Sequence, residues 1–151
     1  MPALLVVPDA SVLLKWVLPS EDEPDVDQAL RLRTAIVNDV VRVLVPALWL
    51  YEVGNTVARR YPAEASRWLT ALMKFGLEEA APSASWLAAA LELTRAHRVT
   101  FYDAAYHALA ISRKGVFVTA DVRYANQMPR DGSVVALSEW KPPVASSSPR
   151  R

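Results

Sequence analysis

Short apolar runs recur along the chain, separated by longer stretches in which apolar residues return every three or four positions. The short runs have the length and the β-branched content of buried strands. They cover residues 4–7, 42–46, 116–119 and 134–137, with a weaker candidate at 77–81. Pro8 follows the first run, and because proline has no N–H to donate, we expect strand pairing to stop there.

Seven stretches have the apolar spacing of helices. The first begins at Ser11, and the others cover residues 21–39, 47–61, 63–75, 85–97, 103–113 and 122–128. Ser11 is the expected N-cap of the first helix. Ser20, with Glu23 three residues later, is expected to form the capping box of the second.

Strands that alternate with helices indicate βαβ units. We therefore expect an α/β fold in which a mostly parallel sheet of about five short strands is flanked by helices. A length of 151 residues and an apolar content of 52% suit one domain with a full core. We expect residues 1–141 to form this domain and residues 142–151, rich in proline and serine, to be a disordered tail.

Composition excludes several classes of function. Seventeen basic and sixteen acidic residues leave a net charge of +1, which indicates no particular partner. The absence of cysteine excludes disulfides, thiolate zinc sites and thiol nucleophiles. No run approaches the roughly 20 apolar residues of a membrane span. The amino terminus lacks a basic leader, so we expect a cytoplasmic protein with no membrane segment.

Acidic residues follow two of the expected strands. Asp9 comes directly after residues 4–7 and Pro8, and Asp121 comes after residues 116–119. The carboxyl ends of parallel strands meet at one edge of a sheet, so these carboxylates can share a crevice. Alone, each is as well explained as a turn or cap residue. Asp103 begins a helix, where its alternative role is an N-cap or a favourable charge on the helix dipole.

Glu52 lies on an otherwise apolar part of the helix at residues 47–61. It shares one helical face with Asn55, Thr56 and Arg59, so a solvated polar stripe is the alternative to a functional role. Gly54 costs this helix about 1 kcal/mol relative to alanine. It either permits a close backbone approach or is simply tolerated.

Three aspartates and one glutamate from separate elements suggest a common site. A site with oxygen ligands alone suits Mg²⁺ or Mn²⁺ and disfavours zinc. Gathered carboxylates repel one another, and a divalent cation relieves this repulsion. The same cation can activate water and stabilise the leaving oxygen of a phosphodiester. The residues themselves therefore predict an acidic metal site.

Four segments in fixed order extend this prediction. They are residues 7–13, 50–55, 100–110 and 116–121, and their spacing covers roughly residues 3 to 137. In this set the chain resembles the PIN-domain ribonucleases, of the VapC type found as toxins in bacterial VapBC toxin–antitoxin pairs. The resemblance implies the PIN-like three-layer fold and a Mg²⁺- or Mn²⁺-dependent endoribonuclease. Hydrolysis by a water held on the metal would leave a 5′-phosphate and a 3′-hydroxyl.

The resemblance also assigns site residues. It makes four carboxylates catalytic metal ligands: those of Asp9, Glu52, Asp103 and Asp121. Three residues behind them would orient the carboxylates or a water: Ser11, Asn55 and Thr119. His107 lies four residues after Asp103, but the family position is commonly apolar or variable. We interpret His107 as a residue of the helix face rather than a ligand.

Partners follow from the same resemblance. RNA is the expected substrate, and a VapB-type antitoxin is expected to lay a helix and an extended tail along the active-site groove. Homodimers are common in the family. An apolar docking surface could come from four residues, which are otherwise core: Trp49, Tyr61, Trp68 and Leu72.

Two other functions remain open. One is a catalytically inactive PIN-like module that binds nucleic acid or protein, which is disfavoured because none of the four acids is missing. The other is a small-molecule phosphohydrolase with an aspartate nucleophile. Ala10 and Ser11 follow Asp9, so the usual Asp-x-Asp start of that chemistry is absent.

Overall fold

A parallel four-stranded sheet forms the centre of the molecule, in a computed structural model that describes residues 3–144. The strand order is β2-β1-β5-β6, with β1 at Leu4–Pro8, β2 at Val41–Val43, β5 at Val116–Thr119 and β6 at Val134–Ala136. Val6 and Val7 in β1 are fully buried, because β1 has strands on both sides and helices over both faces. The predicted α/β fold with a parallel sheet is confirmed.

The predicted strand at residues 42–46 divides between two sheets. After β2, residues Val45–Pro46 form β3, which pairs in parallel with β4 at Glu79–Ala80. Leu44 N–H donates to the Val6 carbonyl at 3.1 Å, whereas Val45 N–H donates to the backbone carbonyl of Glu78 at 3.0 Å. Successive N–H groups of an extended chain point to opposite sides, so the chain passes from one sheet to the other here. The central sheet consequently has four strands, and a two-stranded sheet lies beside it.

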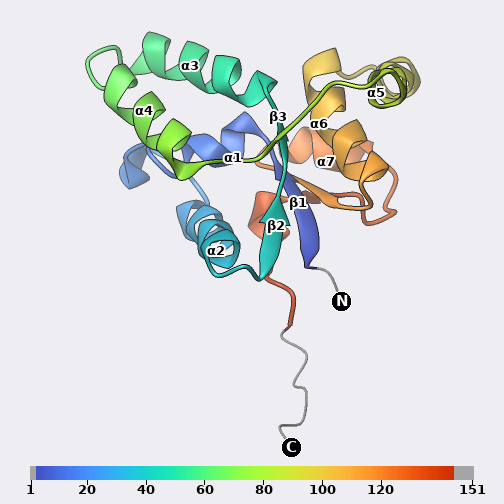
Figure 1. Cartoon of the computed structure of the whole chain (residues 1–151), viewed down its shortest axis with the longest axis horizontal. Helices are drawn as coiled ribbons and strands as arrows, with labels where there is room; N and C mark the ends of the chain where they lie inside the picture. The colour runs from blue at the N-terminus through green and yellow to red at the C-terminus, as the bar shows by residue number, and fades with distance from the viewer. Residues whose placement is uncertain (1–2, 145–151) are drawn as a thin grey trace, which may run out of the picture.

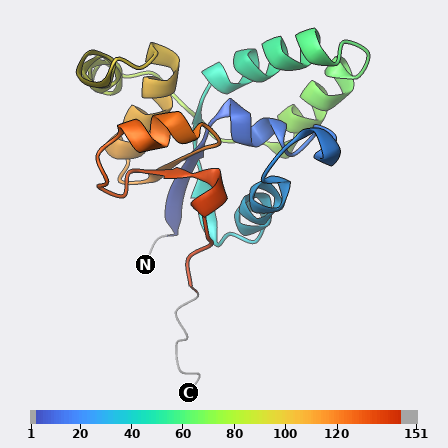
Figure 2. The same ribbon diagram turned by 180° about the vertical axis from the view of Figure 1, so that it is seen from behind.

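Seven α-helices surround the sheet within the described residues. They are α1 (Ala10–Leu14), α2 (Val26–Val37), α3 (Leu48–Arg60), α4 (Ala65–Phe75), α5 (Ala84–His97), α6 (Phe101–Ser112) and α7 (Val122–Gln127). Figure 1 shows the α3–α4 pair on one side of β1 and the α5–α6 pair on the other. Figure 2, from behind, shows α7 on the same side of the sheet as α5 and α6, and the rings of His107 in α6 and Tyr124 in α7 both pack on Phe117 in β5. The sheet is therefore the middle layer of three.

The start of α1 differs from the prediction. Pairing continues through Pro8, which lies opposite Val118, and Asp9 N–H donates to the Val118 carbonyl at 3.2 Å. An N–H on Pro8 would point to the other side, where β2 has already ended, so proline costs no ladder bond here. Asp9, not Ser11, is the N-cap of α1, and its carboxylate accepts a bond from Val12 N–H.

The start of α2 also differs. Ser20 and Glu23 form no capping box; residues Ser20–Asp22 make a short 3₁₀ turn, and α2 begins only at Val26. Glu23 is extended, as expected for a residue before proline. Its carboxylate pairs at 3.1 Å with Lys15, which is only 4% exposed. Glu23 thus pairs with the buried ammonium of Lys15 and not with the N-terminus of a helix.

Two open alternatives are settled by burial. Trp49 and Leu72 are 3% and 2% exposed, so they belong to the core and cannot form a docking surface in this conformation. Tyr61 and Trp68 are partly buried and pack on each other, with ring centroids 5.0 Å apart. Gly54 is simply tolerated, because a Cβ there would meet only Leu69 Cδ2, at 3.8 Å.

The end of the described chain has no regular structure. Residues 142–144 form neither helix nor strand, and the rest of the predicted tail lies outside the described residues. No helix within residues 3–144 is both long and apolar enough to cross a membrane.

Two glycines offer a matched test of the packing. A Cβ on Gly115 would lie 2.7 Å from the carbonyl oxygen of Leu5, at the start of β5. We expect Gly115→Ala to lower the free energy of unfolding by about 1–3 kcal/mol, since backbone must move. Gly54→Ala should instead raise it by about 0.5–1 kcal/mol, because alanine favours the helix. Urea unfolding measures both; equal effects would contradict the close approach at Gly115.

Candidate active site

The four predicted acids lie at one end of the sheet. β1 and β5 are parallel neighbours, with Pro8 opposite Val118, so Asp9 and Asp121 leave the same edge of the sheet. Glu52 comes from the first half of α3, and Asp103 from the first turn of α6. These two helices approach this end from either side of β1 (Figure 1). The fold thus brings together four segments that are far apart in the sequence.

Asp9 is held more firmly than a surface carboxylate. It is 6% exposed. Its Oδ2 accepts a hydrogen bond from the Thr119 hydroxyl at 2.6 Å, and its Oδ1 accepts from the Ser11 hydroxyl. The Ser11 hydroxyl also accepts from Ala120 N–H at 3.1 Å, which ties α1 to the end of β5. Both carboxylate oxygens therefore have fixed directions.

Burial disfavours the charged form of Asp9. Desolvation raises its pKa to about 6, despite the lowering effect of the hydrogen bonds from Ser11 and Thr119. The negative charge of Asp103 raises it further. Near neutral pH, Asp9 is an ionised carboxylate at a free-energy cost that a nearby cation would offset.

Asp103 is the electrostatic centre of the group. Its own pKa is raised by burial and by the charge of Asp121. Its charge in turn raises the pKa values of Asp9 and Glu52, after burial in each case. All four carboxylates are therefore within electrostatic reach of one another through Asp103.

Asp121 is the N-cap of a helix, whereas Asp103 is not. Thr100 is the N-cap of α6, and its hydroxyl accepts from Asp103 N–H at 3.1 Å, so Asp103 is not needed as a cap. Asp121 is the N-cap of α7, and its Oδ1 accepts from Tyr124 N–H at 3.2 Å. The cap role and a role in the acid cluster coexist at Asp121.

Tyr106 is a site residue that the sequence reasoning missed. Its hydroxyl donates to Glu52 Oε1 at 2.6 Å, joining α6 to α3. The ring is fully buried and stacks on Phe117, with centroids 6.0 Å apart. Tyr106 lies one helical turn after Asp103, and this spacing was the available signal. Most residues around Tyr106 in α6 are apolar, so its polar role was not predicted from the sequence.

The remaining polar candidates have other surroundings. Asn55 is exposed, and within residues 3–144 no hydrogen bond joins it to Glu52. His107 is buried, with its two ring nitrogens at 2.8 Å from the hydroxyls of Tyr124 and Ser133. Burial lowers its pKa to about 4, so it is neutral at pH 7 and part of the core.

The four carboxylates are suitable ligands for a hard divalent cation, although two of them form hydrogen bonds with other groups. Within residues 3–144, no three acidic, histidine or cysteine side chains are positioned around one ion. Glu52 is bonded to Tyr106, and Asp121 caps α7. The available ligands are nevertheless all carboxylate oxygens under mutual repulsion, the chemistry that Mg²⁺ and Mn²⁺ satisfy. Binding of one cation by all four carboxylates would require Glu52 and Asp121 to turn away from these partners.

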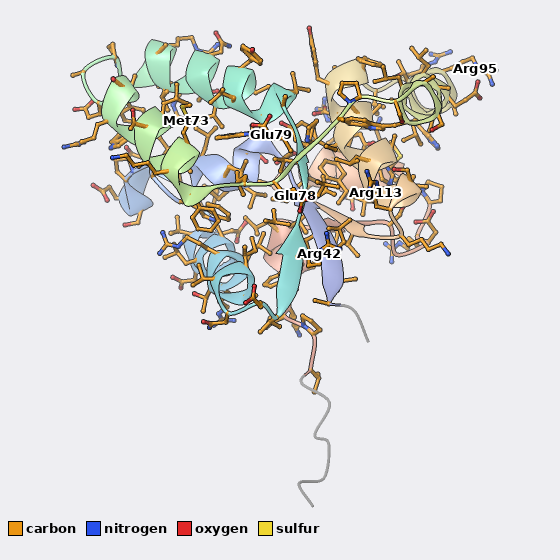
Figure 3. The ribbon with its side chains drawn as sticks, viewed as in Figure 1. Arg42, Met73, Glu78, Glu79, Arg95 and Arg113 are labelled. Carbon is orange, nitrogen blue, oxygen red and sulfur yellow. The ribbon has the colours of Figure 1, made fainter. Side chains whose placement is uncertain are left out.

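A second hollow lies elsewhere in the molecule and differs in the pairing of its acids. A cavity of about 530 Å³ lies between β2, β4 and the turn from α6 to β5. Arg42, Glu78 and Arg113 surround it, away from the end of the sheet that carries the acids (Figure 3). Arg42 and Glu78 form an exposed ion pair at 3.7 Å, and Glu79 accepts from Trp49 Nε1 at 3.3 Å. Its acids are thus already paired, and the acid cluster is the candidate active site.

The raised pKa of Asp9 predicts a pH-dependent stability. Because the folded protein holds this proton more tightly than the unfolded chain, ionisation between pH 3.8 and about 6 costs stability. The full shift corresponds to roughly 3 kcal/mol, most of which is lost as pH rises from 4 to 7 without divalent metal. We expect Asp9→Asn to flatten this fall and to be more stable than the parent at pH 7.

Chemical unfolding across this pH range, in the presence of EDTA, measures the effect. Asp39→Asn is the matched control, because Asp39 is exposed and its φ of 56° suits asparagine. It should keep the slope of the parent protein. An equally steep slope in Asp9→Asn would show that Asp9 is not the destabilising charge.

Comparisons with known proteins agree with this fold. The family model described as PIN domain matches residues 6–128. The structure of PAE2754 from Pyrobaculum aerophilum is similar, with a TM-score of 0.61, 23% identity, and 90% of this chain and 92% of that chain covered. So is VapC20 of Mycobacterium tuberculosis, described as a sarcin-ricin loop cleaving toxin. Its TM-score is 0.60 at 14% identity, with 80% of this chain and 94% of that chain covered.

At these identities the two structures bear on the fold alone. No match was found among curated proteins. The family match covers most of the chain and includes all four acids, from Asp9 to Asp121. PIN domains are generally divalent-metal-dependent nucleases. The chain belongs to the PIN domain family.

Proposed function

We propose that the protein is a Mg²⁺- or Mn²⁺-dependent endoribonuclease, acting in the cytoplasm as the toxin of a VapBC-type toxin–antitoxin pair. The observation that carries this proposal is the coupling of four carboxylates through Asp103 at one edge of the sheet. The PIN family match supports nuclease chemistry. The likeness to VapC20 supports the choice of RNA as substrate and of an antitoxin as partner.

Each residue has a defined task in this proposal. Asp9, Glu52, Asp103 and Asp121 hold the cation. Ser11 and Thr119 fix the direction of the Asp9 carboxylate, and Asn55 extends the polar face of α3 beyond Glu52. A bound Mg²⁺ or Mn²⁺ supplies water activation and stabilisation of the leaving oxygen of a phosphodiester.

The protein's own contribution is orientation and charge. Tyr106 holds Glu52 toward α6, so the carboxylates of two helices stay near each other before a cation arrives. The pairing of β1 with β5 holds Asp9 at the edge of the sheet. Without a cation, the clustered negative charge would repel an RNA phosphate, so substrate binding and metal binding are coupled.

The partners complete the proposal. A VapB-type antitoxin would cover the acid end of the sheet, and a homodimer is the expected assembly. An inactive binding module is the alternative function. The retention of four acids under mutual repulsion disfavours it, because this repulsion destabilises a fold that gains nothing from metal.

Cleavage by the purified protein, free of antitoxin, tests the proposal. VapC20 is described as cleaving the sarcin-ricin loop, so an RNA hairpin with that loop and a pool of cellular RNAs are suitable substrates. We expect cleavage with Mg²⁺ or Mn²⁺ that stops in EDTA and leaves 5′-phosphate ends. Asp103→Asn should reduce the rate by more than about 100-fold, the upper range for loss of a residue that only orients a ligand.

Asp39→Asn serves again as the control and should cleave like the parent protein. Mn²⁺ should raise the melting temperature of the parent and of Asp39→Asn, but not that of Asp103→Asn. Full activity of Asp103→Asn, or cleavage unaffected by EDTA, would contradict the metal-dependent mechanism. Folded protein that binds no metal and cuts no RNA would favour the inactive module.

A further inference from the structure

Two exposed tyrosines directly precede two of the acids in the sequence. Tyr51 precedes Glu52 and is 73% exposed; Tyr102 precedes Asp103 and is 58% exposed. Neither ring belongs to the hydrophobic core. Single exposed apolar residues are ordinary on protein surfaces. The position of these two rings, each in the first turn of a helix that carries an acid, is what distinguishes them.

The helical geometry places Tyr102 at the mouth of the acid cluster. Tyr102 and Tyr106 are four residues apart, so they lie on one face of α6. Tyr106 points along that face to Glu52 on α3. Tyr102 is therefore one turn nearer the helix start, on the side of α6 that faces α3 and outside the buried Tyr106–Glu52 hydrogen bond.

Tyr51 has the corresponding position on α3. The core side of this helix is marked by Trp49, Val53 and Val57, all buried. Tyr51 lies on the opposite side, and about 100° round the helix from Glu52. The acids are thus flanked by one free aromatic ring from each of the two helices that approach them.

We propose that Tyr51 and Tyr102 bind the substrate by stacking on the nucleobases next to the cleaved phosphate. This inference rests on the proposed nuclease function and adds two residues that bind the substrate. Aromatic side chains bind bases by stacking with little sequence preference, because every base has a π-face. A base within a duplex has both faces covered by its neighbours, so only an unstacked base can meet these rings.

Charge on the elements that carry the acids favours RNA over an apolar protein surface. Two exposed arginines, Arg59 and Arg123, lie on or directly beside the elements that carry the acids. Arg59 is two turns after Glu52 on the same face of α3, and Arg123 is two residues after Asp121. In the described residues neither arginine forms an ion pair. Unpaired arginines on the elements that carry the acids suit phosphates, and exposed aromatic rings suit bases.

The test compares a ring with an aliphatic side chain of similar apolar character. Tyr51 and Tyr102 are each changed to Phe, which keeps the π-face, and to Leu, which does not. The substrate is the RNA whose cleavage site has been mapped, and a second version carries a non-hydrolysable methylenephosphonate at that linkage. Val37→Ala, an exposed apolar change at the far end of α2, is the control.

Three readouts separate stacking from a structural role. We expect Leu at either position to weaken binding of the uncleavable RNA by about 5- to 150-fold, and Phe to change it by less than about twofold. 2-Aminopurine beside the cleavage site should be quenched by the parent and the Phe variants but not by the Leu variants. The Mn²⁺-induced rise in melting temperature should be the same in all, because the carboxylates are intact.

Each other outcome has a defined meaning. If the parent cleaves RNA while the Leu and Phe variants bind and cleave it equally well, the stacking inference is wrong and the nuclease function stands. If the parent cleaves no RNA with either metal, the proposed function fails, and this inference with it. If the Leu variants keep RNA binding but lose a co-expressed antitoxin, the rings dock a protein, which also overturns the inference. Cleavage of a perfect duplex as fast as of a loop would do the same.

Discussion

The buried carboxylate of Asp9 is the constraint on which the site depends. Its position is fixed by the register of β1 against β5, which places Asp9 beside Thr119, and by Ser11 from α1. Three hydrogen bonds only partly offset the loss of hydration, so its pKa remains raised to about 6. The fold therefore keeps a carboxylate where an ionised group is unfavourable, and this is understandable if a cation shares the site.

Two of the other acids, Glu52 and Asp103, also have raised pKa values. Asp103 links them electrostatically, and Tyr106 links α6 to α3 by its bond with Glu52. Burial decreases along the series, from Asp9 through the half-buried Glu52 and Asp103 to the exposed Asp121. A rigid inner carboxylate with more adaptable outer ones is a suitable arrangement for holding a cation while a phosphate exchanges. The exposed Tyr51 and Tyr102 directly precede the two half-buried members of this series, Glu52 and Asp103.

Much of the fold was predictable because its patterns are local. Apolar runs marked the strands, the helical spacing marked the helices, and acids after parallel strands predicted a shared edge. The failures involved interactions between distant residues. The hydrogen bond from Val45 N–H to the Glu78 carbonyl divides one predicted strand between two sheets. Glu23 pairs with Lys15 and not with the predicted capping box. The role of Tyr106 depends on Glu52, 54 positions earlier in the chain, so its chemistry could not be read from its neighbours.

The central claim is that these carboxylates hold one divalent metal site. Crystals soaked in Mn²⁺, with anomalous diffraction recorded at the manganese edge, locate the ion directly. The account predicts a peak within coordination distance of the carboxylates of Asp9 and Asp103, with Glu52 or Asp121 turned toward it. The absence of a peak there at saturating Mn²⁺, or Mn²⁺ found only at other surface acids, would contradict the account.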